Sequence, residues 1–444
     1  MATKITSPKG FPEYLPKDQQ RFDYLRNKIA ETYASFGFYH IATPAVEYMK
    51  TLSSTGDVSK EIYAIKRVKG EGEEVNIDNE RGLRFDLTKP LSRYTAEHYN
   101  DLTFPFKRYQ IQPVWRGERP QKGRLREFYQ ADVDIIGNGD LSIGHDFEIL
   151  QVIAATLDSL NIGKFNIKLN HRKLLQDILK KFGVANAHFS DALRIIDKVE
   201  KIGSRGVENL LVEDIFIKEQ NAKHITDLLT NKVSTGDLFN IISAFNVKDK
   251  DPIDENFTMS MYTSFTQLYD FLHLANFKNI NFRFDLSIAR GLDYYTGMVF
   301  ETEFVGYESY GSVASGGRYE NLAGEFTNQK LPGVGGSIGL SRLFTLIQNE
   351  KIELPISEKK PTYYITYFID EHAIKTRQIS EQLRSQNNIV ELAPEPIKLD
   401  KALKYAVNKD IDFLIIVEEN GTFTKKNLKT REQENIENLD LLLK

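Results

Sequence analysis

The feature that most constrains the fold is a pair of long, mostly apolar segments joined by a basic loop. Both segments have the aromatic and β-branched content of strands, and the loop between them contains glycine and proline, which favour turns. The pattern therefore predicts a β-hairpin, which is an antiparallel pair. The first segment runs from about Phe106 to Trp115, and the second returns through Phe128, Gln130, Val133, Ile135 and Ile136.

The charge of this hairpin differs from that of the whole chain. Between Lys107 and Arg126 there are seven lysines or arginines and one acid, Glu118, although the 444-residue chain has a net charge of −4. A charged run is usually a solvated surface. Arg116 and Glu118, however, occupy alternate positions as the chain leaves the strand, so both could face one pocket. Guanidinium groups in such a pocket would suit a phosphate.

Composition sets further limits. The chain is too long for one typical domain, and its 41% hydrophobic content supports a substantial core. It contains neither an apolar run of about 18 residues nor the apolar segment of a secretory signal, so we expect a cytoplasmic protein with no membrane segment. Cysteine is absent, which excludes disulfides, thiolate nucleophiles and cysteine-ligated zinc. Binding of oxygen-ligated metals such as Mg²⁺, or metal binding at sparse histidine sites, remains possible.

The N-terminal part predicts a helix followed by short strands. Apolar residues recur every three or four positions over residues 16–36, and Gly37 ends the pattern before a strand over 38–42. This unit fits either the edge of an α/β domain or a dimer interface. Apolar and polar side chains alternate over residues 83–88, so that Arg84, Asp86 and Thr88 would share one face of a strand. That face is either a polar wall of a site or simply solvated.

The later part of the chain predicts two further blocks. A helix over 140–160 and a strand over 165–170 precede a mostly helical stretch to about residue 275, which we interpret as an insertion for packing or partner contact. A polar, proline-bounded linker over 353–361 then leads to alternating strands and helices. This alternation predicts a separate α/β domain of about 80 residues, a size that can fold alone.

Two glycine-containing motifs lie between these blocks. The first, Arg290–Glu301, groups an arginine, an aspartate and two tyrosines with two glycines before an apolar strand. It is either a turn entering a core strand or a place where a guanidinium and the backbone approach a ligand. The second, Gly333–Leu343, predicts a glycine-rich strand followed by a helix from which Arg342 projects. Tight packing of a helix on a sheet would give the same glycine pattern.

Together these segments resemble the histidyl-tRNA synthetase family, from about Lys9 to the C-terminus. Gly37–Glu47, Arg116–Phe128 and Gly333–Arg342 are similar to the three motifs shared by class II synthetases. Arg290–Tyr295, with the sequence R-G-L-D-Y-Y, and Ser315–Tyr319 are similar to the two histidine-specific elements. Five elements in the right order are much more specific than any one of them.

The resemblance implies an α+β fold, with a class II antiparallel sheet flanked by helices, a helical insertion and a C-terminal α/β anticodon-binding domain. It places the catalytic domain in residues 1–165 and 277–352, the insertion in 166–276 and the anticodon-binding domain in 361–444. The implied partners are ATP, L-histidine, tRNA(His) and a second copy of the chain in a homodimer. Mg²⁺ would accompany ATP, and no zinc is implied.

The implied reaction is the ATP-dependent ligation of L-histidine to tRNA(His) through histidyl-adenylate, with release of pyrophosphate and AMP. Because the first step joins two anions, the site must neutralise and align them. By the resemblance, Arg290 and Arg116 are the catalytic arginines. The residues implied to bind ATP are Arg116, Glu118, Arg126, Phe128 and Arg342. Those implied to bind histidine are Asp86, Leu87, Thr88, Arg116, Gln130, Asp134, Arg290, Tyr294 and Tyr295.

We expect Tyr295 and an acid to contact the imidazole ring. A pocket that forms hydrogen bonds to both ring nitrogens rejects analogues that lack those nitrogens. The chain departs from the family at Phe85, where the family often has proline, at Asp134, where many members have glutamate, and at Ser341, where an acid commonly precedes the arginine.

Two other functions stay open: a histidine-sensing regulatory subunit of ATP phosphoribosyltransferase, and a non-enzymatic RNA-binding module. The retained Arg116, Arg290 and Arg342 and the C-terminal domain favour the synthetase, because a histidine sensor needs neither arginines that hold ATP nor a domain that reads an anticodon.

Overall fold

The computed structural model describes residues 5–53, 61–66, 80–119, 123–230, 276–288, 295–321, 323–356 and 360–437. The chain divides into two compact units, Met1–Pro355 and Ile356–Lys444. Among the described residues, no helix is both long and apolar enough to cross a bilayer.

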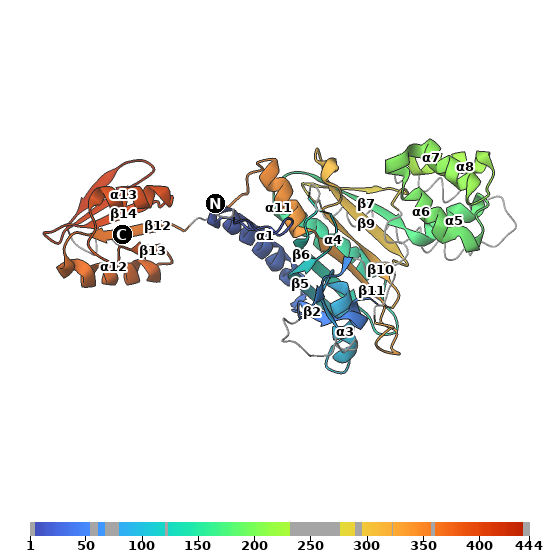
Figure 1. Cartoon of the computed structure of the whole chain (residues 1–444), viewed down its shortest axis with the longest axis horizontal. Helices are drawn as coiled ribbons and strands as arrows, with labels where there is room; N and C mark the ends of the chain where they lie inside the picture. Colours follow the sequence, from blue (N-terminus) through green and yellow to red (C-terminus); the bar gives the residue numbers. More distant parts are fainter. Residues whose placement is uncertain are drawn as a thin grey trace. The chain divides into compact units, whose positions relative to one another are not determined.

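The first unit is built on an eight-stranded sheet with the order β1-β5-β6-β11-β10-β9-β7-β8 (Figure 1). β1 pairs with β5 in parallel and β7 with β8 in parallel, whereas the other neighbours are antiparallel. The predicted hairpin is confirmed, because β5 and β6 pair along their whole length. The strands are β1 (Tyr39–His40), β5 (Phe106–Trp115), β6 (Glu127–Ile136), β7 (Phe165–His171), β8 (Ile280–Phe284), β9 (Met298–Phe304), β10 (Ala314–Tyr319) and β11 (Gly333–Ile338).

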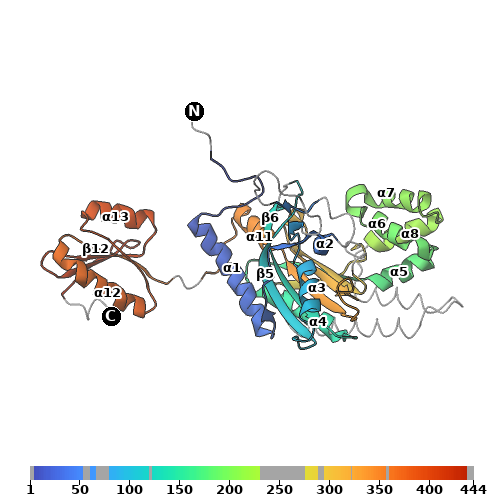
Figure 2. The ribbon, with the colours of Figure 1, turned by 60° about the horizontal axis from the view of Figure 1, so that its bottom comes forward.

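Three helices cover one face of this sheet: α1 (Pro16–Ser35), α4 (Gly144–Ser159) and α11 (Leu340–Asn349) (Figure 2). The predicted apolar stripe of α1 is confirmed, and Gly37, with φ of 80°, follows its end. α4 begins four residues later than the sequence pattern predicted. In β6, alternate side chains belong to the same core as these helices. The core residues of α1 and β6 are Phe22, Leu25, Ile29, Tyr33, Ala131, Val133 and Ile135.

The prediction of one strand over residues 83–88 is wrong. The strand β4 ends at Leu83, and helix α3 (Thr88–Glu97) begins five residues later. The Asp86 carboxylate accepts a hydrogen bond from the Lys89 backbone N–H (3.0 Å), which satisfies a free amide of the first helical turn. β4 (Arg81–Leu83) instead lies between β2 (Val46–Tyr48) and β3 (Ala64–Ile65) in a small separate sheet, and α2 (Met49–Leu52) follows β2.

Arg84 does not face solvent. Its guanidinium is buried and donates hydrogen bonds to the carbonyls of Thr43 (2.6 Å), Pro44 (3.2 Å) and Pro113 (3.0 Å). The side chain therefore ties the segment before β2 to the end of β5.

Helices follow β7, as the sequence predicted. They are α5 (Arg172–Lys181), α6 (Phe189–Ile196), α7 (Val199–Glu213) and α8 (Glu219–Thr230). The predicted apolar face of α5 is buried, at Leu174, Leu175, Ile178 and Leu179. The predicted helical pattern over residues 231–275 lies outside the described residues.

The second unit has a five-stranded mixed sheet with the order β13-β12-β14-β15-β16. The first three strands in this order are parallel, and the last two are antiparallel. The predicted alternation is confirmed, but the polar strand β16 was missed. The elements are β12 (Thr362–Tyr367), α12 (Ala373–Ser385), β13 (Ile389–Leu392), α13 (Leu399–Asn408), β14 (Phe413–Val417), β15 (Phe423–Asn427) and β16 (Gln433–Ile436).

Candidate active site

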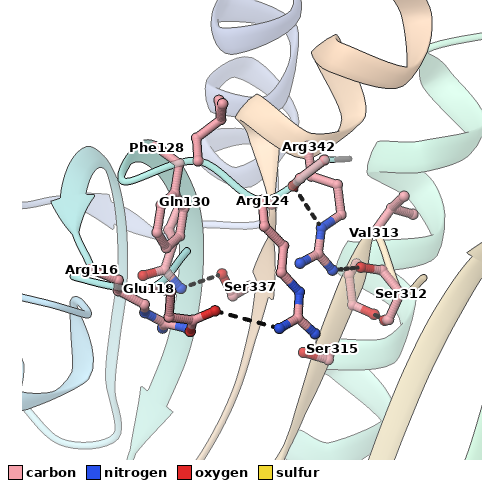
Figure 3. A pocket seen from close by; sticks show the side chains of 14 residues that line it. Arg116, Glu118, Arg124, Phe128, Gln130, Ser312, Val313, Ser315, Ser337 and Arg342 are labelled. Atoms are coloured by element: carbon pink, nitrogen blue, oxygen red, sulfur yellow. Dashed lines mark hydrogen bonds and ion pairs between the residues drawn. The ribbon is translucent and has the colours of Figure 1, made fainter. Parts of the chain in front are cut away.

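The face of the main sheet opposite α1 and α4 carries a cavity of about 360 Å³ (Figure 3). It lies over β6, β10 and β11 and is bounded by the loops that precede β6 and β10. Its lining is unusually basic for a chain with net negative charge, since three arginines enter it. The lining residues are Arg116, Glu118, Gly123, Arg124, Leu125, Phe128, Gln130, Ser312, Val313, Ala314, Ser315, Ser337, Gly339 and Arg342.

Arg342 reaches this cavity from the first turn of α11. Its Nη1 donates to the Ser312 carbonyl (2.6 Å) and its Nε to the Gly123 carbonyl (3.3 Å), so that it holds both bounding loops. Burial, followed by the neighbouring guanidiniums of Arg124 and Arg116, lowers the pKa of Arg342. The proximity of these three guanidiniums concentrates positive charge in the site, which favours an anionic ligand.

Arg116 enters the cavity from the end of β5. Its Nε donates to the Phe85 carbonyl (3.0 Å), and its guanidinium lies 5.2 Å from the centre of the Phe128 ring. Glu118 pairs with Arg124 in the cavity lining (Figure 3). Oε2 of Glu118 lies 3.4 Å from Nη1 of Arg124. A flat ring in an arginine-lined cavity can accept a base by stacking while the guanidiniums hold phosphates.

Deeper on the same face, the polar side chains of β6 continue the floor of the site. Gln130 Nε2 donates to Ser337 Oγ (3.2 Å). Asp134 Oδ1 accepts from the Tyr319 hydroxyl (3.1 Å), and its Oδ2 lies 2.7 Å from Arg108 Nη2. Burial raises the pKa of Asp134, although Arg108 opposes the shift.

The predicted site residues fall into three groups. Arg116, Glu118, Phe128, Gln130 and Arg342 line the cavity together. Arg126 does not line the cavity; it lies in the loop before β6, where its Nε donates to the backbone carbonyl of Glu118 (3.2 Å).

The second group lies beside the cavity. Asp86 is close enough to Tyr295 that its charge, with those of Asp134 and Asp132, raises the tyrosine pKa after burial itself. Leu87 is fully buried, and Thr88 is the first residue of α3. Arg290 and Tyr294, the third group, lie outside the described residues.

Several polar residues of this face were missed by the sequence analysis. Arg124, Ser315 and Ser337 line the cavity, and Arg108 and Asp132 lie beneath it. A usable signal was present in β6, because Gln130, Asp132 and Asp134 share one side of the strand by simple alternation. β6 pairs with β11, which brings Ser337 beside Asp132. These segments are about 200 residues apart, so no local sequence pattern predicts their contact.

Two of the three departures from the family pattern, Ser341 and Asp134, have hydrogen-bond or ion-pair partners in the structure. Ser341 is buried, and its Oγ accepts a hydrogen bond from the Tyr129 N–H (2.8 Å), on the side of α11 that faces β6. Ser341 therefore helps to attach α11 to β6 and does not act as a hydrogen-bond partner of Arg342. Asp134 is anchored by Arg108 and Tyr319, as described above.

Within the described parts of the chain, no group of three or more acidic or histidine side chains could hold a metal ion by itself. Glu118 and Glu301 do lie near Arg342, because both charges oppose the lowering of its pKa. Two carboxylates beside an arginine-lined cavity supply the kind of oxygen ligand that Mg²⁺ prefers.

An antiparallel-rich sheet with helices on one face and an arginine-lined cavity on the other is the arrangement of a class II aminoacyl-tRNA synthetase. A family model described as histidyl-tRNA synthetase matches residues 10–343. A histidine–tRNA ligase of Clostridium tetani is 38% identical over 96% of this chain and 94% of its own length. The chain therefore belongs to the histidyl-tRNA synthetase family.

Solved structures agree with this assignment. The histidyl-tRNA synthetase of Nostoc sp. PCC 7120 matches with a TM-score of 0.84 and 32% identity, over 98% of this chain and 97% of that one. A Bacillus halodurans structure described as an ATP phosphoribosyltransferase regulatory subunit/histidyl-tRNA synthetase matches with a TM-score of 0.73. Its 18% identity over 94% of this chain and 99% of that one shows a shared fold only.

Proposed function

We propose that the chain ligates L-histidine to tRNA(His) in two steps. The histidine carboxylate attacks the α-phosphate of ATP, which forms histidyl-adenylate and releases pyrophosphate. The terminal ribose hydroxyl of the tRNA then attacks the acyl carbon, which forms the ester and releases AMP. No protein nucleophile takes part, so catalysis depends on alignment and charge stabilisation.

The observation that carries this proposal is the convergence of Arg116, Arg124 and Arg342 on one cavity beside Phe128. Arg116 is suited to hold the α-phosphate and the substrate carboxylate, because it lines the cavity and its charge also acts on Asp86. Arg342 is suited to the γ-phosphate and Phe128 to stacking on adenine. Glu118 would contact the adenine, and Arg126 would bind the outer phosphates. Arg290, as the second catalytic arginine, comes from the family signature.

The histidine site in this proposal is the polar region beyond Gln130. Asp86, with Leu87 and Thr88, would receive the α-amino group, because the start of α3 presents a buried carboxylate there. Gln130, Asp134, Tyr294 and Tyr295 would form the rest of the pocket. An acid near the imidazole favours its protonated form.

Other features of the proposal concern partners. Mg²⁺ enters with ATP and offsets phosphate charge. The C-terminal unit binds the anticodon, the helices after β7 contact the acceptor stem, and two copies associate through the segment that contains Pro44. The homodimer would work in the cytoplasm, where its substrates are made.

The test is pyrophosphate exchange into ATP with each amino acid offered separately. We expect exchange with histidine alone, and a loss of about 100-fold or more in Arg116→Ala and Arg290→Ala, the usual effect of removing a group that stabilises developing charge. No exchange despite histidine binding would favour a regulatory subunit. Retention of tRNA without adenylate formation would favour a non-enzymatic RNA-binding module.

A further inference from the structure

The place where β7 ends and α5 begins, residues 169–172, lies next to the segment that carries the histidine signature, residues 290–295. We call residues 169–172 the β7 corner. In the main sheet β7 lies between β8 and β9. Because β7 is parallel to β8 and antiparallel to β9, β8 ends and β9 begins beside this corner. The connection from β8 to β9, which includes the signature, therefore starts and finishes at the β7 corner.

Asn170 holds the start of this connection. Its Nδ2 donates hydrogen bonds to the carbonyls of Leu286 (3.3 Å) and Ile288 (2.9 Å). Its Oδ1 accepts from the His171 N–H (2.7 Å), so the amide can point its nitrogen only toward the two carbonyls. Asn170 is 1% exposed, so removal of its amide would take this donor from two carbonyls in a buried place.

Arg172 holds the end of the connection. Its backbone N–H donates to the Gly297 carbonyl (3.0 Å), which extends the pairing of β7 with β9 by one residue. Its Nη1 donates to the Tyr295 carbonyl (3.1 Å). A Cβ at Gly297 would lie 2.9 Å from Arg318 Cδ, so the backbone passes close to that side chain and has little room to move.

The β7 corner is itself well supported. His171 caps α5, because its Nδ1 accepts a hydrogen bond from the Lys173 N–H (3.2 Å). Burial, ahead of the nearby charges of Arg318 and Lys173, lowers the pKa of His171 to about 4. The ring is therefore neutral at pH 7 and can accept this hydrogen bond. The start of α5 is thus fixed by a local contact that does not involve the signature.

We propose that Asn170 and Arg172 are positioning residues for the activation of histidine, and that they act through the histidine signature. Neither residue lines the cavity. This inference rests on the proposed function, because it assigns a support to the arginine that the proposed function places at the α-phosphate.

The physical reason is the short distance along the chain between the two anchors. Only residues 289–294 separate Ile288, whose carbonyl Asn170 binds, from Tyr295, whose carbonyl Arg172 binds. A short segment with both ends fixed can reach few places, so the anchors limit where Arg290 can lie. A catalytic group must be held within a fraction of an ångström of its productive position.

The test is pyrophosphate exchange with histidine in Asn170→Ala. We expect kcat to fall by about 10- to 100-fold, because a small misplacement of a catalytic group is costly, while the KM for ATP stays within about threefold. Asn166→Ala is the matched control. Asn166 lies on the same face of β7, four residues earlier, and its Oδ1 accepts from Asn281 Nδ2 (3.3 Å) in β8. This control should change kcat by less than about threefold.

Arg172→Ala tests the other anchor at a half-buried position, where substitution disturbs folding less than at Asn170. We expect kcat to fall in the same way, with the KM for ATP again within about threefold. Arg172→Lys keeps the charge but not the planar fork, so it should restore part of the activity. Normal kcat in folded Asn170→Ala and Arg172→Ala proteins would overturn the inference.

A double-mutant cycle separates positioning from a general structural defect. In the Arg290→Ala background, we expect Asn170→Ala to lower kcat by less than about threefold, because the group that it positions is already gone. A defect unrelated to the signature would lower kcat by the same factor in both backgrounds. That result, or equal losses in Asn170→Ala and Asn166→Ala, would show that the inference is wrong.

Histidine binding separates this inference from the proposed function. A wild type without exchange would overturn the proposed function, and titration calorimetry with histidine would then decide the role of Asn170. Binding about 10-fold weaker in Asn170→Ala than in Asn166→Ala would still show that Asn170 positions the signature, which contains two of the proposed histidine ligands, Tyr294 and Tyr295. Equal binding in the two variants would overturn the inference.

Discussion

At the scale of single residues, the candidate site depends on charges that are brought together out of water. Arg342 illustrates this, because it donates to two backbone carbonyls and also lies near Arg116 and Arg124. Its role as a phosphate ligand and its role in holding the loops at Gly123 and Ser312 are both open to test by substitution.

Arg342→Ala should lower kcat/KM for ATP by about 100-fold in pyrophosphate exchange while leaving the KM for histidine within about threefold, because a guanidinium fork on phosphate is lost. Arg342→Lys keeps the charge without the fork, so we expect an intermediate loss. Arg194→Ala, at an exposed arginine of α6, is the control. Equal losses toward ATP and histidine would point to collapse of the loops instead.

Asp132 should make the stability of the protein depend on pH. Burial raises its pKa to about 7, so between about pH 4 and pH 7 the folded protein holds a proton that the unfolded chain has released. Stability from this group therefore falls as pH rises through that window. We expect the Tm of Asp132→Asn, relative to wild type, to rise by about 2 °C or more from pH 5 to pH 8 in calorimetry without ligand. A constant difference would contradict the shift.

The sequence predicted single residues well where alternation or a motif marked them. Arg116, Glu118, Phe128, Gln130 and Arg342 were predicted and share one cavity. Asp132 was missed because the motif points to its neighbours, although the alternation of β6 includes it. The ion pair of Arg108 with Asp134 joins two strands, and no local pattern reveals that Arg108, the one arginine of β5, is buried against that carboxylate.

At the scale of elements, the glycines of β10 and β11 have a specific spatial purpose. Gly335 stands opposite Asp134 in β6 and leaves the space that this carboxylate occupies. Gly317 likewise leaves space for the Tyr295 ring, which lies 2.8 Å from the position of a Cβ. Because these glycines have no side chains, β10 and β11 leave space above the sheet for polar groups but contribute less side-chain packing there.

Gly335→Ala should therefore displace Asp134. The added Cβ would lie 2.0 Å from Oδ1 and 2.9 Å from the Val133 carbonyl, so the carboxylate must leave Arg108 or the strands must separate. We expect at least a 10-fold rise in the KM for histidine and a lower Tm, measured by exchange and by thermal unfolding. Gly144→Ala in α4, where the Cβ meets only Ser142 Oγ at 3.5 Å, should change neither. A normal KM would show that Asp134 can move freely.

Elements were predicted reliably where one local pattern extended over many residues. The periodicity of α1 and the apolar and aromatic content of β5 predicted both elements, and the strand–helix alternation after residue 361 predicted the second unit. The segment over 83–88 was predicted wrongly, because its alternation is real but the Asp86 side chain caps α3 there. The local hydrogen bond from the backbone to the Asp86 side chain therefore decided the structure of this segment, although its apolar and polar residues alternate as in a strand.

At the scale of the whole molecule, the order of strands in the main sheet cannot be derived from the sequence pattern alone. β6 lies beside β11 although about 200 residues separate them, and the site forms along that contact. The second unit has its own core and its own sheet. The proposed division of labour is that the first unit makes the adenylate and the second selects the tRNA.

Removal of residues 356–444 tests this division. We expect the remaining chain to keep pyrophosphate exchange with histidine within about fivefold of the full chain, because every described cavity residue belongs to the first unit. Aminoacylation of tRNA(His) should fall by about 100-fold or more through loss of anticodon contacts. Comparable loss of both activities, in a truncated protein with a normal unfolding transition, would contradict it.

The parallel pairing of β7 with β8 has a practical meaning for trimming this molecule. The chain leaves β7 at one end and must enter β8 at the opposite end, about 16 Å away for a five-residue strand. A tight turn cannot make that connection, which takes about a dozen residues or more. The segment that holds α5 to α8 is thus an obligatory crossover enlarged with helices. A minimal version of the enzyme could replace it with a shorter crossover, but could not delete it outright.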